Sequence, residues 1–92
     1  MSKQFIVLYD DSNGASSTYG EDKSCEGALE LTGGADACLW FENREDARNA
    51  IKISTLHNRL LQMQGKPYNG DFVECLKFIK IKQLKSYVKP SR

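Results

Sequence analysis

The sequence has little of what marks membrane proteins and secreted proteins. No apolar run is longer than five residues, as in residues 5–9, whereas a membrane-spanning helix needs about 18 or more. A run of this length is also too short for the apolar core of a signal peptide. We therefore expect a protein of the cytoplasm that does not use a membrane.

A recognisable cysteine pattern is missing as well. Cys25, Cys38 and Cys75 are an odd number of cysteines and lie 13 and 37 positions apart. This spacing fits neither a disulfide framework nor a Cys-x-x-Cys metal site. We expect all three thiols to be reduced and packed as small apolar groups, and we expect no metal and no cofactor.

Recognisable catalytic groups are also missing. His57 is the only histidine, and it falls on the apolar side of a predicted helix, where a neutral, hydrogen-bonded imidazole is more common than a catalytic base. Gly33 and Gly34 lack the lysine and the strand-to-helix position of a phosphate loop. The sequence therefore predicts a binding protein without a small-molecule substrate, and not an enzyme.

What the chain does contain is enough for one small domain. Its 92 residues are 40% apolar, and a chain of this size buries roughly 60% of the surface that it exposes when unfolded. No internal repeat is visible in the sequence. We expect a single domain over residues 1–92, with one core, and a monomer.

Residues 43–63 have the clearest pattern, that of an amphipathic helix. Asn43 can cap the first turn, Glu45 and Asp46 lie at its positive end, and Gly65 follows its last turn. At about 100° per residue, one side collects small and apolar residues, which we expect to be buried. This side contains Ala47, Ala50, Ile51, Ser54, His57 and Leu61, with Ile53 and Leu60 at its margin.

The opposite side of the same helix carries a basic stripe. Its members are four, four and seven positions apart, which places them on one side of a helix. They are Arg44, Arg48, Lys52 and Arg59. We predict that this basic stripe contacts acidic groups or phosphate on a partner.

Strands are predicted before and after the helix. Residues 3–9 carry apolar side chains on both faces, as in a central strand. Residues 25–32 and 37–42 flank a glycine pair and are predicted to form a hairpin, and residues 72–84 a long last strand. The fold class is therefore α+β: a small, mainly antiparallel sheet of about four strands packed against one long helix, in the order strand, hairpin, helix, strand.

Residues 10–24 are predicted to be a long, flexible loop. Loops of this length are usually functional or disordered, so the segment is either a contact surface or a flexible loop without contacts. The acidic side chains are candidate contacts, with Tyr19 as an aromatic anchor. The acidic candidates are Asp10, Asp11, Glu21 and Asp22. The tail at residues 86–92 is also expected to be flexible.

Trp40 is a further candidate for partner binding. In the predicted strand at residues 37–42 it lies on the face opposite Phe41, which we expect to pack under the helix. An uncovered indole would serve as an interface hot spot or as a stacking platform for a base. The alternative is that a loop covers half of it.

Charge is unevenly distributed along the chain, although the net charge is +1. Residues 1–46 hold three basic and ten acidic residues, a balance of −7, and residues 47–92 hold ten basic and two acidic residues, a balance of +8. Separated charge steers and orients a partner. The alternative is that the two halves interleave in space and neutralise each other.

Two kinds of binding protein fit these features. One docks on a large protein or ribonucleoprotein assembly and blocks it. The other binds nucleic acid, with the basic stripe and the lysines of the last strand on the backbone and Trp40, Phe78 or Tyr87 on the bases. A protein that binds naked nucleic acid is normally basic overall, and the acidic half would repel phosphate, which favours the first kind.

The whole chain resembles a phage-encoded anti-CRISPR protein of the class that inhibits the type I-F surveillance complex. The resemblance runs from MSKQFIVLYDDSNGASSTYG through WFENREDARNAIKISTLHNRLL to FVECLKFIKIKQLKSYVKP, without a motif that assigns roles to single residues. It implies a non-enzymatic inhibitor in the cytoplasm of a host bacterium. Such an inhibitor binds the Cas proteins of this complex, with guide-RNA phosphate as a further contact, and blocks recognition of target DNA. The net charge of +1 argues against mimicry of a DNA duplex by the whole surface.

Overall fold

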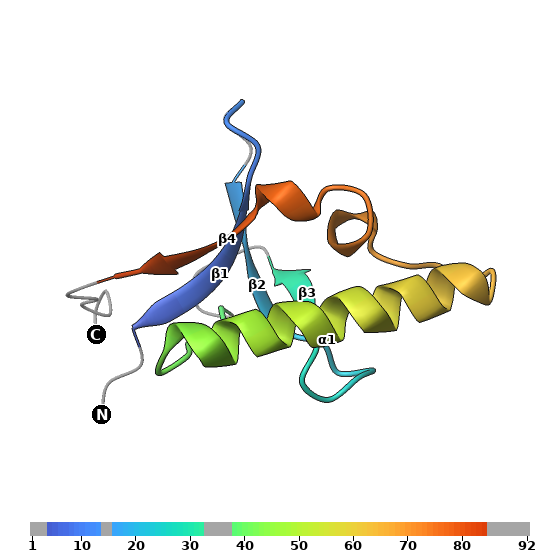
Figure 1. Ribbon diagram of the computed structural model, residues 1–92, viewed down its shortest axis with the longest axis horizontal. Coiled ribbons are helices and arrows are strands. Elements are labelled where there is room, and N and C mark those ends of the chain that lie inside the picture. The colour runs from blue at the N-terminus through green and yellow to red at the C-terminus, as the bar shows by residue number, and fades with distance from the viewer. Residues whose placement is uncertain (1–3, 14–15, 33–37, 85–92) are drawn as a thin grey trace.

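The computed structural model describes residues 4–13, 16–32 and 38–84. Its four strands form one antiparallel sheet in the order β3-β2-β1-β4, and α1 lies across one face of that sheet (Figure 1). The predicted α+β fold class is confirmed. In chain order the elements are β1 (Phe5–Asp10), β2 (Ser16–Glu21), β3 (Leu29–Thr32), α1 (Arg44–Met63), the short 3₁₀ helices η2 (Gly70–Phe72) and η3 (Leu76–Phe78), and β4 (Ile79–Gln83).

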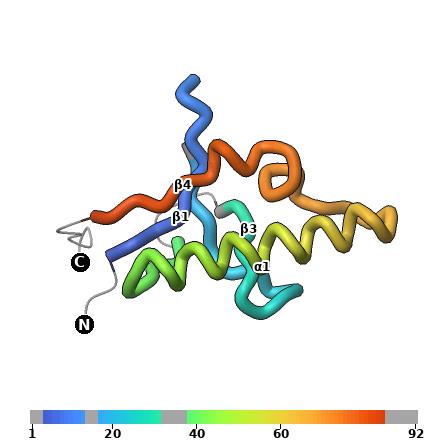
Figure 2. Tube along the Cα trace, in the orientation of Figure 1, coloured from blue at the N-terminus to red at the C-terminus, as the bar shows by residue number. Residues whose placement is uncertain are grey.

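β1 is a central strand, as its apolar residues on both faces predict. It pairs with β2 on one side and with β4 on the other. Val7 belongs to the core beneath α1 and Tyr9 packs against it, while alternation places Ile6 and Leu8 on the opposite face. Figure 2 shows β1 and β4, the first and last strands of the described chain, lying side by side.

β2 corrects the prediction of a long loop over residues 10–24. Its first three residues pair with β1, from Ser16 opposite Asp10 to Thr18 opposite Leu8. Its last four residues pair with β3. Tyr19 is fully buried, and its ring packs on Phe72 with the centroids 5.1 Å apart. The segment is polar apart from Tyr19, so its place in the sheet depends on these distant partners and not on its own sequence pattern.

The hairpin therefore lies earlier in the chain than predicted, since it consists of β2 and β3. The predicted turn at Gly33 and Gly34 lies outside the described residues. Residues 38–42 do not form the second hairpin strand, because among them only Phe41 makes a bridge, to Phe5. The backbone N–H of Leu39 donates to the carbonyl of Tyr19 at 3.0 Å. This segment thus joins β1 to β2 beyond the point where their own pairing ends.

α1 has a cap at each end, close to the predicted bounds. Asn43 Oδ1 accepts a hydrogen bond from the Asp46 backbone N–H at 2.8 Å, which satisfies a donor of the first turn. At the other end Gly65 has φ +72°. The N–H groups of Gly65 and Lys66 donate to carbonyls of the last turn at 3.1 and 2.9 Å, a Schellman motif.

The core lies between α1 and the sheet. Small residues on α1 allow the strands to approach closely, and Phe41 packs against the core as predicted. Ile53 and Leu60, placed at the margin of the buried side by the sequence pattern, are exposed. The core cluster consists of Val7, Tyr19, Leu29, Ala47, Ala50 and Phe72.

The prediction of one long strand over residues 72–84 is correct only for β4. The preceding residues form η2 and η3 instead. Asn69 Oδ1 accepts a hydrogen bond from the Asp71 N–H at 2.9 Å, which starts the turn of η2, and Phe72 is buried against Tyr19. The alternation of apolar and polar residues before β4 therefore belongs to two short helical turns and not to a strand. The tail at residues 86–92 lies outside the described residues.

Candidate interaction surface

Two buried polar side chains fix which side of α1 faces solvent. Ser54 Oγ accepts a hydrogen bond from the Leu29 N–H of β3 at 2.8 Å and donates to the Ala50 carbonyl at 2.6 Å. Asn58 Oδ1 accepts from the Asn69 N–H at 2.8 Å. β3 and the segment before η2 are thereby tied to the same side of α1. The sequence pattern did not single out Asn58, although its spacing of four from Ser54 was a signal.

The predicted basic stripe lies on the solvent side of α1, where all four side chains are exposed. The Arg44 guanidinium lies 5.3 Å from the centroid of the Phe5 ring, a cation–π contact that holds it at the start of the helix. The other three cations lie further along α1. They are Arg48, Lys52 and Arg59.

Large apolar side chains lie beside these cations on α1, and the sequence pattern did not single them out as a group. Leu56, Leu60 and Met63 are 69%, 52% and 82% exposed. At 100° per residue they fall within roughly 60° of the helix circumference, and a contiguous exposed apolar patch is typical of an interaction site. We call the six residues together the α1 face: Arg48, Lys52, Leu56, Arg59, Leu60 and Met63.

A groove extends the α1 face onto η3. It has a volume of about 300 Å³ and is lined by Ile51, Lys52, Thr55, Leu56 and Leu76. The Thr55 hydroxyl donates to the Ile51 carbonyl at 2.9 Å, so it has a partner within the helix. Among these five lining residues, Lys52 carries a positive charge and none carries a carboxylate. The groove is therefore apolar with a positive rim.

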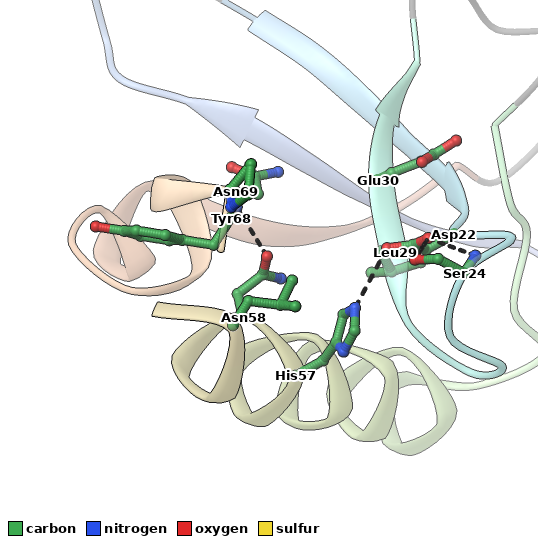
Figure 3. Close-up of a pocket in the computed structure, with 10 residues that line it drawn as sticks. Asp22, Ser24, Leu29, Glu30, His57, Asn58, Tyr68 and Asn69 are labelled. Atoms are coloured by element: carbon green, nitrogen blue, oxygen red, sulfur yellow. Dashed lines mark hydrogen bonds and ion pairs between the residues drawn. The ribbon is translucent and has the colours of Figure 1, made fainter. Parts of the chain in front are cut away.

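A second hollow, of about 380 Å³, lies where α1 meets β3 and the segment before η2 (Figure 3). His57 Nε2 is 3.9 Å from Asp22 Oδ2, and Ser24 Oγ donates to Asp22 Oδ1 at 2.6 Å. In a hydrolase triad the histidine stands between the serine and the carboxylate, whereas here the carboxylate is in the middle. The three side chains tie the turn after β2 to α1 and do not activate Ser24 as a nucleophile.

The structure divides the predicted acidic contacts into two separate pairs. Asp10 and Asp11 lie where β1 ends, and each Oδ1 accepts a hydrogen bond from the N–H two residues later, at 3.0 and 2.9 Å. Glu21 and Asp22 lie at the far end of β2, which is roughly 17 Å long. The four carboxylates therefore do not form one acidic loop.

Neither aromatic candidate forms part of the α1 face. Tyr19 cannot be a contact residue, because it is fully buried and its hydroxyl donates to Asp71 Oδ2 at 2.9 Å. Burial first, and then the bond to Asp71, raise the pKa of Tyr19 far above its ordinary value. Trp40 is partly buried in residues 38–42.

The three cysteines are free thiols and partly buried, and burial raises the pKa of the Cys38 thiol. Within residues 4–13, 16–32 and 38–84, no three histidine, cysteine or carboxylate side chains are placed to hold a metal ion. In the same part of the chain, no helix combines the length and the apolar character needed to cross a membrane.

No protein-family model, curated protein or solved structure matches this chain.

Proposed function

We propose that this protein is a non-catalytic binding protein that docks on a large protein or ribonucleoprotein assembly and blocks it. The observation that supports the proposal is the α1 face, where three exposed apolar side chains lie beside three exposed cations. Interfaces combine an apolar centre with a polar rim. A target with acidic or phosphate groups around an apolar contact would match this face.

The resemblance of the chain to phage-encoded anti-CRISPR proteins suggests a specific target, the type I-F CRISPR surveillance complex of a bacterial host. In this proposal the protein is a phage-encoded anti-CRISPR inhibitor that acts in the host cytoplasm. It binds Cas subunits of the complex and prevents recognition of target DNA or its hybridisation to the guide. The cations of the α1 face suit acidic Cas side chains and guide-RNA phosphate alike.

A small nucleic-acid-binding regulatory protein is the second candidate. Lys80 and Lys82 favour it, because both are exposed on the edge strand β4 and could contact phosphate. The α1 face argues against it, since none of its six residues is an aromatic on which a base could stack. Its large exposed apolar side chains suit a protein partner better.

A pull-down with matched variants tests the proposal. Tagged protein is added to lysate of cells that contain the type I-F complex, with and without nuclease. We expect Cas subunits to be recovered in both arms and lost, by about tenfold or more, with the triple variant Arg48→Glu, Lys52→Glu and Arg59→Glu. The double variant Lys80→Glu and Lys82→Glu is the control, and it should bind as the wild type does.

Three results would count against this function. They are failure to recover Cas subunits, recovery that nuclease abolishes, and equal recovery with the triple variant. Loss of binding in the Lys80 and Lys82 variant alone would favour the nucleic-acid candidate. All of the changed side chains are exposed, so each variant should keep its helix content. Circular dichroism checks this.

A further inference from the structure

The groove between α1 and η3 has the dimensions of a site for a few apolar side chains. Its volume of about 300 Å³ is at the lower end of the range for ligand pockets, roughly 300–1,000 Å³. Leu76 forms its η3 wall and is 40% exposed. From Leu56, at the edge of the groove, the row of exposed apolar side chains runs to Met63, which is roughly 10 Å further along the helix axis.

The charges around this groove favour an occupant of negative charge. Lys52 lines the groove, and Arg48 and Arg59 are exposed on the same side of α1. The acidic residues of α1, Glu45 and Asp46, are in its first turn. An occupant with carboxylates beside its apolar side chains would pair with the three cations, whereas a basic one would be repelled.

Three other occupants fit this geometry less well. In a second copy of this chain, packed α1 against α1, the three cations of each copy would face those of the other, and the one carboxylate on that side of each helix, Glu45, is in its first turn. A nucleic acid would gain no stacking from leucine and methionine side chains. A bilayer surface is flat on this scale and would leave the space between Leu56 and Leu76 unfilled.

We propose that the groove and the α1 face bind an acidic amphipathic helix of a partner protein. In helix-in-groove recognition, apolar anchors at positions i, i+3 or i+4, and i+7 enter the groove. Here one anchor occupies the space between Leu56 and Leu76, and the next ones pack on Leu60 and Met63. Carboxylates beside the anchors reach Arg48, Lys52 and Arg59. This inference deepens the proposed function, since it names the chemistry of the partner at the same surface.

Synthetic peptides test this inference without knowledge of the partner. One helical peptide carries leucines spaced four and three apart with glutamates beside them, and its match carries lysines in place of the glutamates. We expect the glutamate peptide to bind about tenfold tighter or more at low salt, with the difference shrinking as salt screens the charges. Amide chemical-shift changes should centre on residues 51–56 and on Leu76.

Single variants locate the site. Leu56→Ser and Leu76→Ser should each weaken binding of the glutamate peptide by about tenfold, the usual effect of removing an apolar anchor. Leu31→Ser is the matched control, because Leu31 is 46% exposed on β3 and does not line the groove. It should leave the affinity unchanged.

Several outcomes would overturn the inference. Two concern the peptides: equal affinity for both of them, or chemical-shift changes centred away from the groove. A third is binding to phosphatidylserine vesicles that Leu56→Ser abolishes, in a protein that does not bind the glutamate peptide. The fourth is a dimer, detected by sedimentation, that Leu56→Ser dissociates. The two proposals can fail separately. Peptide binding without recovery of Cas subunits rejects the proposed target alone, and recovery of Cas subunits without peptide binding rejects the helix partner alone.

Discussion

Tyr19 joins two parts of the chain that are 52 positions apart. Its ring lies against Phe72 and its hydroxyl donates to the carboxylate of Asp71. Burial of the side chain and this hydrogen bond both favour the neutral phenol, so the pKa of Tyr19 in the folded protein is raised, while in the unfolded chain it is about 10. The folded state therefore holds this proton more tightly than the unfolded state does.

We predict that Tyr19→Phe lowers the free energy of unfolding by about 1–2 kcal/mol at pH 7, through loss of the bond to Asp71. Because the pKa is raised on folding, the stabilisation from the bound proton is fully present below pH 10 and is lost as pH rises above it. The difference between wild type and variant should shrink by about 1.4 kcal/mol per pH unit above 10. Urea unfolding at pH 7, 9 and 11 measures it, and a constant difference would contradict the prediction.

Single residues of the candidate site were predictable from sequence to different degrees. The exposure of Arg48, Lys52 and Arg59 follows from helical spacing alone, which is a local property. Tyr19 illustrates the opposite case, since an aromatic in a polar stretch is equally consistent with an anchor on the surface and with a core residue. Only its contacts with Phe72 and Asp71 decide between the two.

At the scale of elements, the sequence predicted α1 well because both of its ends and its buried side depend on residues within the helix or next to it. β2 could not be predicted in the same way. Ser16–Glu21 contains one large apolar residue, and the segment is a strand because β1 and β3 pair with it from both sides. The stretch before β4 alternates apolar and polar residues as a strand does, but Asn69 and Gly70 favour a turn and Phe72 enters the core.

The C-terminal end of α1 depends on Gly65. Its φ of +72° lies in the left-handed region, which costs a residue with a Cβ roughly 1–2 kcal/mol. An added Cβ would meet no atom within 4 Å, so this cost would come from the backbone alone. The turn at Gly65 carries the chain from the exposed Met63 back toward Asn69, which bonds Asn58.

We predict that Gly65→Ala lowers the free energy of unfolding by about 1 kcal/mol, after the gain from a stiffer unfolded chain is subtracted. Gly70→Ala is the control, since its added Cβ would make an ordinary contact with Glu74 at 3.6 Å and it has no positive φ. Thermal or urea unfolding of the two variants checks this. Equal stability of Gly65→Ala and wild type would show that the helix ends differently in solution.

At the scale of the whole molecule, exposed charges of opposite sign lie on opposite sides of β1 in the sheet. Glu21 and Glu30 are exposed on β2 and β3, and Lys80 and Lys82 are exposed on β4. The sequence shows only that the two halves of the chain differ in charge. The strand order β3-β2-β1-β4 separates these four side chains in space, because β1 lies between the acidic strands and β4.

We predict that the protein is retained on both anion and cation exchangers at pH 7 and low salt, although its net charge is only +1. Lys80→Gln with Lys82→Gln should elute from the cation exchanger at lower salt than wild type does. Glu21→Gln with Glu30→Gln should do the same on the anion exchanger. Passage of the wild type through both columns without retention would mean that its charges neutralise each other across the surface.

The pairing of β1 with β4 also determines how the molecule responds to force. Phe5 lies opposite Gln83, and the Leu84 N–H donates to the Gln4 carbonyl at 2.9 Å, so both ends of the described chain meet at one end of an antiparallel pair. Tension between them would break the hydrogen bonds of this pair one after another, as in a zipper, and not all at once. A machine that pulls the two ends apart would thus meet little mechanical resistance before Val7, a buried member of the core cluster, is exposed.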